Sequence, residues 1–138
     1  MITFVDTNVL LDVFLPDPEW GSKSKENLEI AFNQGALIVN EIIYSELSTQ
    51  FPDREMLDDA LRQLSIRIVS LDLEVAFQAG KKWQQYRKTG GKRNRVLADF
   101  LIGAHAAMRS EKLLTRDRGF YTKYFKELDV QYVSRGRP

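Results

Sequence analysis

The chain has 138 residues, 43% of them hydrophobic, and its 20 basic and 19 acidic side chains give a net charge of +1. This length and composition suit one domain with a real hydrophobic core, so we expect residues 1–138 to form a single domain. The lack of cysteine excludes disulfides, thiolate metal sites and cysteine nucleophiles, and the single histidine, His105, excludes any site that needs two.

The first half of the chain alternates short apolar runs with helical spacing. In chain order, the patterns predict a strand at 2–6, a helix at 9–15 stopped by Pro16 and Pro18, a helix at 22–33 closed by Gly35, a strand at 36–39, a helix capped by Asn40 that runs to residue 50, and a helix from 52–53 to about residue 64.

The second half repeats the alternation. Its patterns predict a strand at 66–70, a long helix from the Asp72 cap to about residue 88, a break at Gly90–Gly91, a helix at 96–110, a strand at 113–115, a short helix at 121–125 and a strand at 130–133. Strands that alternate with helices indicate an α/β fold with a mostly parallel central sheet and helices on both faces. No long apolar run predicts a membrane span, and no secretory signal pattern opens the chain.

Four acidic residues follow these elements in a pattern that indicates one divalent-metal site. Asp6 and Asp117 come just after strand runs, at the sheet edge where open parallel sheets bind ligands, while Glu46 lies within a helix. Asp99 lies near the start of its helix, where the helix dipole favours negative charge. Carboxylates gathered in one place are best tolerated around a hard cation such as Mg²⁺ or Mn²⁺.

The helix that carries Asp99 shows one apolar stripe. The stripe consists of Leu97, Leu101, Ala104 and Met108. Asp99 points away from it, beside the small residues Gly103 and Ala106, which should leave room for an ion or a phosphate.

A basic segment interrupts an otherwise acidic chain. Residues 81–95 hold seven of the 20 basic residues and no acid, and Lys92, Arg93 and Arg95 lead directly into the Asp99 helix. A charge run is usually a solvated surface. Here we favour RNA contact, because an acidic site repels a phosphate backbone unless positive charge lies nearby. For Trp83 and Tyr86 we favour packing over stacking on bases.

These residues together resemble the PIN-domain nucleases, and closely the VapC-type toxins of prokaryotic toxin–antitoxin pairs. The resemblance covers nearly the whole chain and is carried by four short motifs, namely Asp6-Thr7-Asn8, Ser45-Glu46-Leu47, Ala98-Asp99-Phe100 and Thr115-Arg116-Asp117. It implies a PIN-like three-layer fold and a metal-dependent endoribonuclease. The family's acidic quartet falls on Asp6, Glu46, Asp99 and Asp117. Its supporting polar positions, which we expect to contact the substrate, fall on Thr7, Asn8 and Thr115.

The resemblance also implies a mechanism and partners. Asp6, Asp99, Asp117 and Glu46 would hold one or two Mg²⁺ or Mn²⁺ ions, and an activated water would cut RNA to leave 5′-phosphate and 3′-hydroxyl ends. The expected partners are a cognate antitoxin and a second copy of the chain, in the cytoplasm. The alternative is a non-catalytic RNA- or partner-binding module on the same fold.

Other polar residues are expected to be ordinary. We interpret Asp12, Asp17 and Glu19 as a solvated face and loop, and His105 as a helix residue without a catalytic role. Repulsion among the four carboxylates predicts that Asp99→Asn stabilises the metal-free protein, unless Asp99 also makes a hydrogen bond that holds its loop.

Overall fold

The computed structural model describes residues 1–90 and 96–133. Twelve elements alternate along these residues, in the order β1 (Ile2–Val5), α1 (Thr7–Phe14), α2 (Gly21–Gln34), β2 (Ala36–Val39), α3 (Glu41–Ser48), α4 (Arg54–Gln63), β3 (Ile66–Ile68), α5 (Leu73–Lys88), α6 (Leu97–Arg109), β4 (Lys112–Thr115), α7 (Phe120–Tyr124) and β5 (Val130–Tyr132). Every predicted strand and helix is present, with its ends within a few residues of the prediction.

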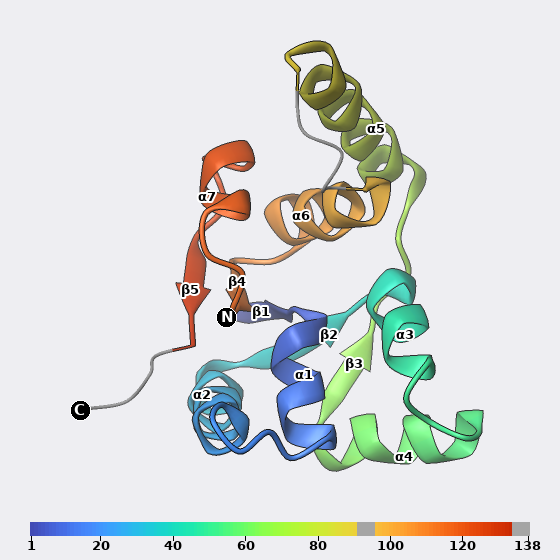
Figure 1. Ribbon diagram of the computed structural model, residues 1–138, viewed down its shortest axis with the longest axis vertical. Coiled ribbons are helices and arrows are strands. Elements are labelled where there is room, and N and C mark those ends of the chain that lie inside the picture. Colours follow the sequence, from blue (N-terminus) through green and yellow to red (C-terminus); the bar gives the residue numbers. More distant parts are fainter. Residues whose placement is uncertain (91–95, 134–138) are drawn as a thin grey trace.

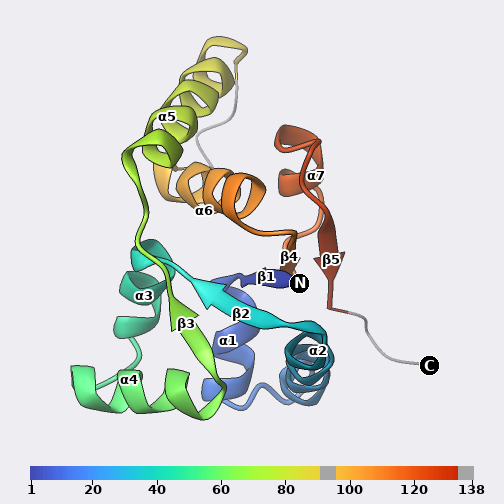
Figure 2. The same ribbon diagram turned by 180° about the vertical axis from the view of Figure 1, so that it is seen from behind.

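The five strands form one sheet in the order β3-β2-β1-β4-β5, and all neighbouring pairs are parallel. The sheet is wholly parallel, and each pair of strands that are consecutive in the sequence is joined by one or two helices, as parallel pairing requires. The helices α1 and α2 lie on one side of the sheet and α5 and α6 on the other (Figures 1 and 2). The predicted three-layer α/β fold is confirmed.

Strand composition explains why both faces are covered. In β1, β2 and β4 nearly every residue is buried, as in Phe4, Val5, Leu113 and Leu114. Continuous apolar runs are typical of parallel strands that have helices on both faces. The carboxyl ends of β1 and β4, which are adjacent strands, therefore bring Asp6 and Thr115 to the same edge.

Helix ends are fixed by polar caps, and two of these caps, Asn40 and Asp72, were predicted. Asn40 caps α3 through hydrogen bonds from the Ile42 and Ile43 amides to its side-chain oxygen, and Asp53 and Asp72 cap α4 and α5. The Asn40 cap matters for the site, because α3 carries Glu46. The described residues contain no helix long and apolar enough to cross a membrane.

The apolar stripe of α6 is only part of its buried face, since Ala104 is buried and Leu101 and Met108 pack against the core from half-buried positions. Leu97 is 39% exposed and Leu101 is half-buried, whereas Phe100, Gly103 and His105 are buried. The Phe100 ring packs among aromatic residues from α5 and α7, which are Tyr86, Phe120, Tyr124 and Phe125. These aromatic rings lie far along the chain from α6, so the periodicity of α6 alone could not identify the buried face.

Gly103 serves packing rather than ligand binding. A side-chain carbon placed there would collide with the Phe125 ring, and both Gly103 and Ala106 are buried. The room that these small residues were predicted to leave for an ion is filled by Phe125. Gly119, just before α7, has φ +106°, a conformation that favours glycine.

Candidate active site

Asp6 lies at the centre of the polar residues at the carboxyl edge of the sheet. It follows β1 directly and caps α1, and it is only 6% exposed. Its Oδ1 accepts a hydrogen bond from the Thr7 amide (2.8 Å), and its Oδ2 accepts one from the Thr115 hydroxyl (2.7 Å). The Asn8 side chain approaches the same Oδ2 at 3.4 Å. Two neighbouring strands thus hold one buried carboxylate.

The pKa of Asp6 rises from 3.8 to about 6, and burial is the largest cause. The hydrogen bonds from Thr115 and Thr7 oppose the rise, while the negative charges of Glu46 and Asp117 add to it. An ionised carboxylate that is buried and faces two like charges is costly without a cation. The electrostatics of Asp6 therefore favour either a proton or a metal ion at this position.

Glu46 reaches the site from α3. Its side chain is exposed, and its Oε1 accepts a hydrogen bond from the Thr7 hydroxyl (2.8 Å). Thr7 consequently links two carboxylates, with its amide on Asp6 and its hydroxyl on Glu46. This bridge joins residues that are 39 positions apart in the sequence.

Asp117 reaches the site from the loop after β4. Its amide donates to the Thr115 hydroxyl oxygen (2.9 Å), whose own proton goes to Asp6. The next amide back, that of Arg116, donates to Asn8 Oδ1 (3.1 Å). Thr7, Asn8 and Thr115 thus hold the acidic residues in place, and their predicted contact with substrate stays a prediction.

Asp99 makes a hydrogen bond within its own helix. It is half-buried in the first turn of α6, and its Oδ2 accepts a hydrogen bond from the Val96 amide (3.1 Å). This bond caps the helix. The charges that raise the pKa of Asp6 come from Glu46 and Asp117. The carboxylate of Asp6 therefore feels the charges of Glu46 and Asp117, while the contact found for Asp99 is a helix-capping bond.

The donor chemistry of the site fits a hard divalent cation. Asp6, Glu46 and Asp117 offer only oxygen, which Mg²⁺ and Mn²⁺ prefer. Within residues 1–90 and 96–133, no three Asp, Glu or His side chains come close enough to hold one ion between them. Mg²⁺ commonly takes only one or two carboxylates and keeps several waters, so an open carboxylate pair centred on Asp6 fits it better than a closed protein cage.

Comparison with known proteins decides the family. The sequence model of the PIN domain matches residues 3–126, which is most of the chain. This chain belongs to the PIN-domain family. The family confirms the predicted class of enzyme in general terms, a nuclease. A comparison with curated proteins found no match.

Solved structures with the same fold include several VapBC complexes. One is VapBC2 from Rickettsia felis, bound to a DNA fragment from its promoter. It superposes with a TM-score of 0.75 at 19% sequence identity, over 97% of this chain and 100% of that chain. VapBC-1 from nontypeable Haemophilus influenzae gives 0.70 at 20% identity (96% and 98% covered), and a toxin–antitoxin complex from Klebsiella pneumoniae gives 0.68 at 18% (96% and 97%). At these identities the likeness shows a shared fold alone.

The PIN domain contains one buried ion pair that the sequence interpretation missed. Asp12 on α1 was expected to be solvated, but it is only 3% exposed and binds the Arg116 guanidinium with both oxygens (2.7 and 2.8 Å). Asp17 and Glu19 do lie in a loop, where Asp17 accepts hydrogen bonds from the Glu19 and Trp20 amides. An available signal was the position of Asp12 among Leu10, Leu11 and Val13 on a short apolar helix.

The basic segment of this PIN domain is only partly covered by the structure. Lys92, Arg93 and Arg95, the predicted RNA contacts, lie outside the described residues. Of the two aromatic residues in the segment, Tyr86 is 5% exposed and packs on Phe100, which confirms its expected packing role. Trp83 is half-buried and has the Arg87 guanidinium over its ring.

His105 is buried in α6, away from solvent, and its contact is with a helix cap. It is fully buried, and its Nδ1 lies 3.0 Å from Asn40 Nδ2, so Nδ1 accepts a hydrogen bond from the residue that caps α3. Burial lowers the pKa of His105, which favours the neutral ring. Its place in the PIN domain is therefore in the support of α3.

We expect His105→Ala to separate stability from activity. The substitution leaves a cavity and removes a partner of Asn40, so it should lower the free energy of unfolding by on the order of 1–3 kcal/mol. Nuclease activity below the melting transition should stay within about threefold, since the metal-assisted reaction that the sequence leads us to expect needs no imidazole. Urea melts and initial rates measure the two effects. A thousandfold loss of activity in a folded variant would instead indicate histidine-based chemistry.

Proposed function

We propose that this protein is a Mg²⁺- or Mn²⁺-dependent endoribonuclease that hydrolyses RNA phosphodiester bonds and acts as the toxin of a toxin–antitoxin pair. The observation that carries the proposal is Asp6, a buried carboxylate with a pKa of about 6 that faces the negative charges of Glu46 and Asp117 on a PIN fold. Such a carboxylate gains most from binding a divalent cation.

The residues of the site have different proposed roles, which follow from how exposed each side chain is. Buried Asp6, held by Thr7 and Thr115, offers a fixed anionic oxygen for the ion. Exposed Glu46, oriented by the Thr7 hydroxyl, can accept a proton from the water that attacks phosphorus. A divalent ion bound there would polarise the phosphate and favour ionisation of that water.

Asp117 and Asp99 complete the proposed set. Asp117 would share the ion with Asp6, a role supported by its negative charge, which contributes to the raised pKa of Asp6. Asp99 uses Oδ2 for the Val96 amide, and we propose that its carboxylate contributes through Oδ1 to a second ion or to the attacking water. We do not expect Asp99 to be as critical as Asp6, since Asp6 is the buried carboxylate.

The reaction makes a definite prediction about products, which tests the proposal. Attack by water rather than by the ribose 2′-hydroxyl leaves a 5′-phosphate and a 3′-hydroxyl. The purified protein, incubated with RNA and Mn²⁺, should give fragments that ligate directly at their 5′ ends and carry no cyclic phosphate. Fragments with 2′,3′-cyclic phosphate ends would contradict the mechanism. RNA binding with no cleavage under any metal supply would favour the non-catalytic alternative.

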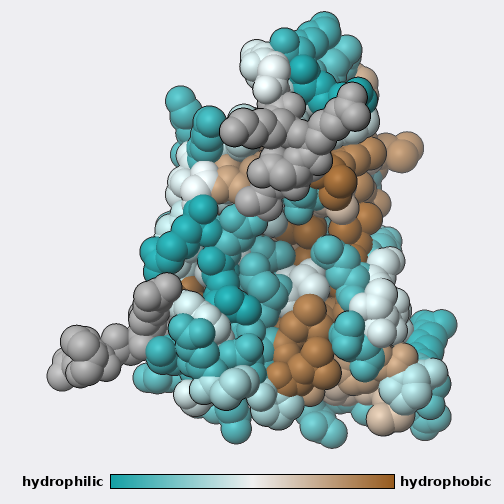
Figure 3. Space-filling view, in the orientation of Figure 1, coloured by the Kyte–Doolittle hydropathy of each residue, from teal (hydrophilic) through white to brown (hydrophobic). Residues whose placement is uncertain are grey.

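The partners follow from the same proposal. The fold neighbours were solved as toxin–antitoxin complexes, and we infer a cognate antitoxin and a homodimer for this chain. The surface supports a protein partner, since apolar side chains gather over α5 and α6 (Figure 3) and include Leu73 (88% exposed), Phe77 (61%) and Val96 (58%). Exposed apolar patches of this kind mark interaction sites. The proposed RNA substrate places the activity in the cytoplasm.

The basic segment provides a test of RNA binding that is separate from chemistry. Replacing Lys92, Arg93 and Arg95 together by Ala should weaken RNA binding more than it slows single-turnover cleavage at saturating RNA. Each phosphate contact with single-stranded RNA adds about 0.7 to the slope of log affinity against log salt concentration, so the slope should fall by roughly 2. Fluorescence anisotropy across a salt series measures it.

A charge-matched control separates local contact from net charge. Arg54, Arg62 and Arg67 are exposed on and beside α4, at the far end of the molecule from α5 (Figure 1). Their triple replacement by Ala removes the same charge and should leave the slope unchanged. Equal slopes for the wild type and the 92/93/95 variant would assign the segment to another role.

A further inference from the structure

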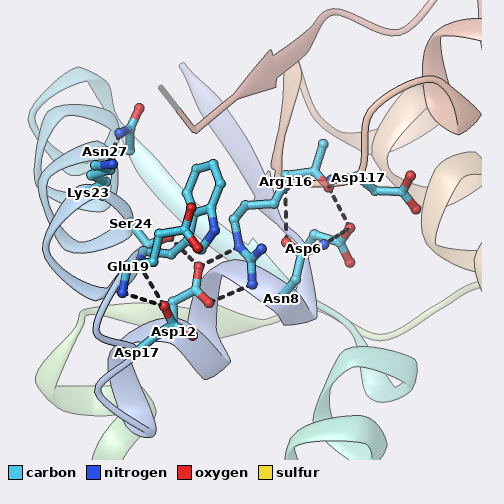
Figure 4. A network of polar contacts seen from close by, with 12 residues as sticks. Asp6, Asn8, Asp12, Asp17, Glu19, Lys23, Ser24, Asn27, Arg116 and Asp117 are labelled. Carbon is cyan, nitrogen blue, oxygen red and sulfur yellow. Dashed lines mark hydrogen bonds and ion pairs between the residues drawn. The ribbon is translucent and has the colours of Figure 1, made fainter. Parts of the chain in front are cut away.

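One buried ion pair lies next to the acidic residues without belonging to them. The Arg116 anchor, as we name it, consists of Arg116, Asp12, Ser24 and Trp20. The guanidinium of Arg116 binds both oxygens of Asp12 (2.7 and 2.8 Å) and lies over the Trp20 ring, 4.9 Å from its centroid. The Ser24 hydroxyl donates to Asp12 Oδ2 (2.6 Å). The anchor joins α1 and α2 to the loop that follows β4 (Figure 4).

Stability alone does not explain this pair. Asp12 is 3% exposed and the Arg116 side chain 28%, so both charges lose hydration on folding. Buried ion pairs can often be replaced by apolar residues of similar volume without loss of stability. What a forked guanidinium–carboxylate pair supplies, and an apolar contact does not, is a fixed direction. The pair therefore indicates that the position of the Arg116 backbone matters.

The loop that contains Arg116 is joined to the acidic site by hydrogen bonds of residues 115–117, one from a side chain and two from backbone amides. The Thr115 hydroxyl donates to Asp6, the Arg116 amide donates to Asn8, and the Asp117 amide donates to Thr115. Figure 4 shows the Arg116 side chain directed toward Asp12, while Asp6 and Asp117 lie on the other side of the loop backbone. One residue thus faces the anchor with its side chain and the site with its main chain.

We propose that Asp12 and Arg116 are positioning residues, which fix the 115–117 loop so that Asp117 and Asp6 hold the divalent ion at a productive separation. The inference rests on the proposed function. The effect is geometric, because Asp12 and Arg116 contribute opposite charges that largely cancel. Misplacing a reacting group by a fraction of an ångström to 1 Å can cost about a hundredfold in rate, and loss of a residue that orients a metal ligand typically costs about 10–100-fold in metal affinity or activity.

The test compares three variants of the full chain. Asp12→Leu with Arg116→Met removes both charges at similar volume, so the fold should survive. Arg116→Lys keeps the charge but loses the fork. Arg109→Met is the matched control, since Arg109 also pairs with an aspartate, Asp72 (3.0 Å), but on the α5–α6 side of the sheet. Mn²⁺ affinity is measured by calorimetry, and kcat and KM are measured on RNA.

We expect the double variant to bind Mn²⁺ about 10–100-fold more weakly and to lose a similar factor in kcat, with KM for RNA within about twofold of wild type. Raising Mn²⁺ should restore part of kcat, which it would not do for a general loosening of the fold. Arg116→Lys should fall between the double variant and wild type. Arg109→Met should match wild type in all three constants.

The outcomes separate the two inferences. Unchanged Mn²⁺ affinity and kcat in a folded double variant would contradict the inference that Asp12 and Arg116 position the site. If the double variant does not fold, Arg116→Lys decides, and a wild-type value for its Mn²⁺ constant overturns the anchor in the same way. If the wild type binds Mn²⁺ but cuts no RNA, the proposed function fails, while the Mn²⁺ affinities still decide whether the anchor positions the ion.

Discussion

Asp6→Asn is expected to lower single-turnover RNA cleavage by a factor of about a thousand or more. A bound divalent ion supplies several kcal/mol of transition-state stabilisation, and each factor of ten in rate corresponds to about 1.4 kcal/mol. Asn keeps the size of the side chain and can still bind the Thr7 amide, but it offers no anionic oxygen from the most buried position of the site. The loss should therefore lie in chemistry and metal binding, not in folding.

Asp53→Asn is the matched control for this prediction. Asp53 also caps a helix, accepting a hydrogen bond from the Met56 amide (2.9 Å), and it lies at the start of α4. Asn caps helices about as well as Asp, so this variant should cleave RNA at the wild-type rate. If Asp6→Asn kept activity within about tenfold of wild type, Asp6 would not hold the ion.

Asp6→Asn should also make the metal-free protein more stable near neutral pH. The folded-state pKa of Asp6 is about 6 and the unfolded value is 3.8. The folded protein therefore binds more protons between these values, and the stability contributed by this group is present below pH 3.8 and is lost as pH rises to and beyond about 6. At about 1.4 kcal/mol per pKa unit, ionised Asp6 costs on the order of 3 kcal/mol.

Urea melts in EDTA across this pH range measure the effect. The variant should exceed wild type by roughly 1–3 kcal/mol near neutral pH, and the two should converge in acid, where Asp6 is protonated. Saturating Mn²⁺ should reverse the order, because only wild type gains binding energy from the ion. A variant that is the less stable protein in EDTA at neutral pH would show that the Asp6 carboxylate is structural.

The structure indicates that the stabilising substitution is at Asp6 and not, as the sequence predicted, at Asp99. Repulsion among four equal carboxylates would make Asp99→Asn stabilising, but Asp99 accepts a hydrogen bond from the Val96 amide. Asn can still accept this bond, but it loses the negative charge that the first turn of a helix favours, which typically contributes about 0.3–1 kcal/mol and offsets relief of repulsion. The burial that raises a carboxylate pKa belongs to Asp6.

Local signals predicted the elements of the fold well. The Asn40, Asp53 and Asp72 caps and the apolar strand runs are each contained in a few neighbouring residues, so the helices and strands could be assigned from the sequence. Strand order could not be assigned in the same way. The sheet places β4 beside β1, and no feature of either strand's sequence predicts that β1 pairs with β4.

The sequence predicted the kind of site but not its supports. Asp6 and Asp117 could be chosen from residue type and position after the strands, and Glu46 from its place in the acidic quartet of the resembling family. The Arg116–Asp12 pair could not, because its two residues are 104 positions apart and each alone resembles a solvated charge. Gly103 was misinterpreted for the same reason. The space beside it is filled by the ring of Phe125, which lies at the C-terminal end of α7 and is distant from Gly103 in the sequence.

Metal-dependent cleavage is the most direct test of the proposed site. The protein should be stripped with EDTA, incubated with RNA, and then titrated with Mn²⁺, with Asp6→Asn carried through in parallel. We predict no cleavage in EDTA, restoration of cleavage in wild type as Mn²⁺ saturates the site, and no restoration in Asp6→Asn. Undiminished cleavage of RNA by the EDTA-stripped wild type would contradict the assignment of Asp6, Glu46 and Asp117 as a metal-dependent nuclease centre.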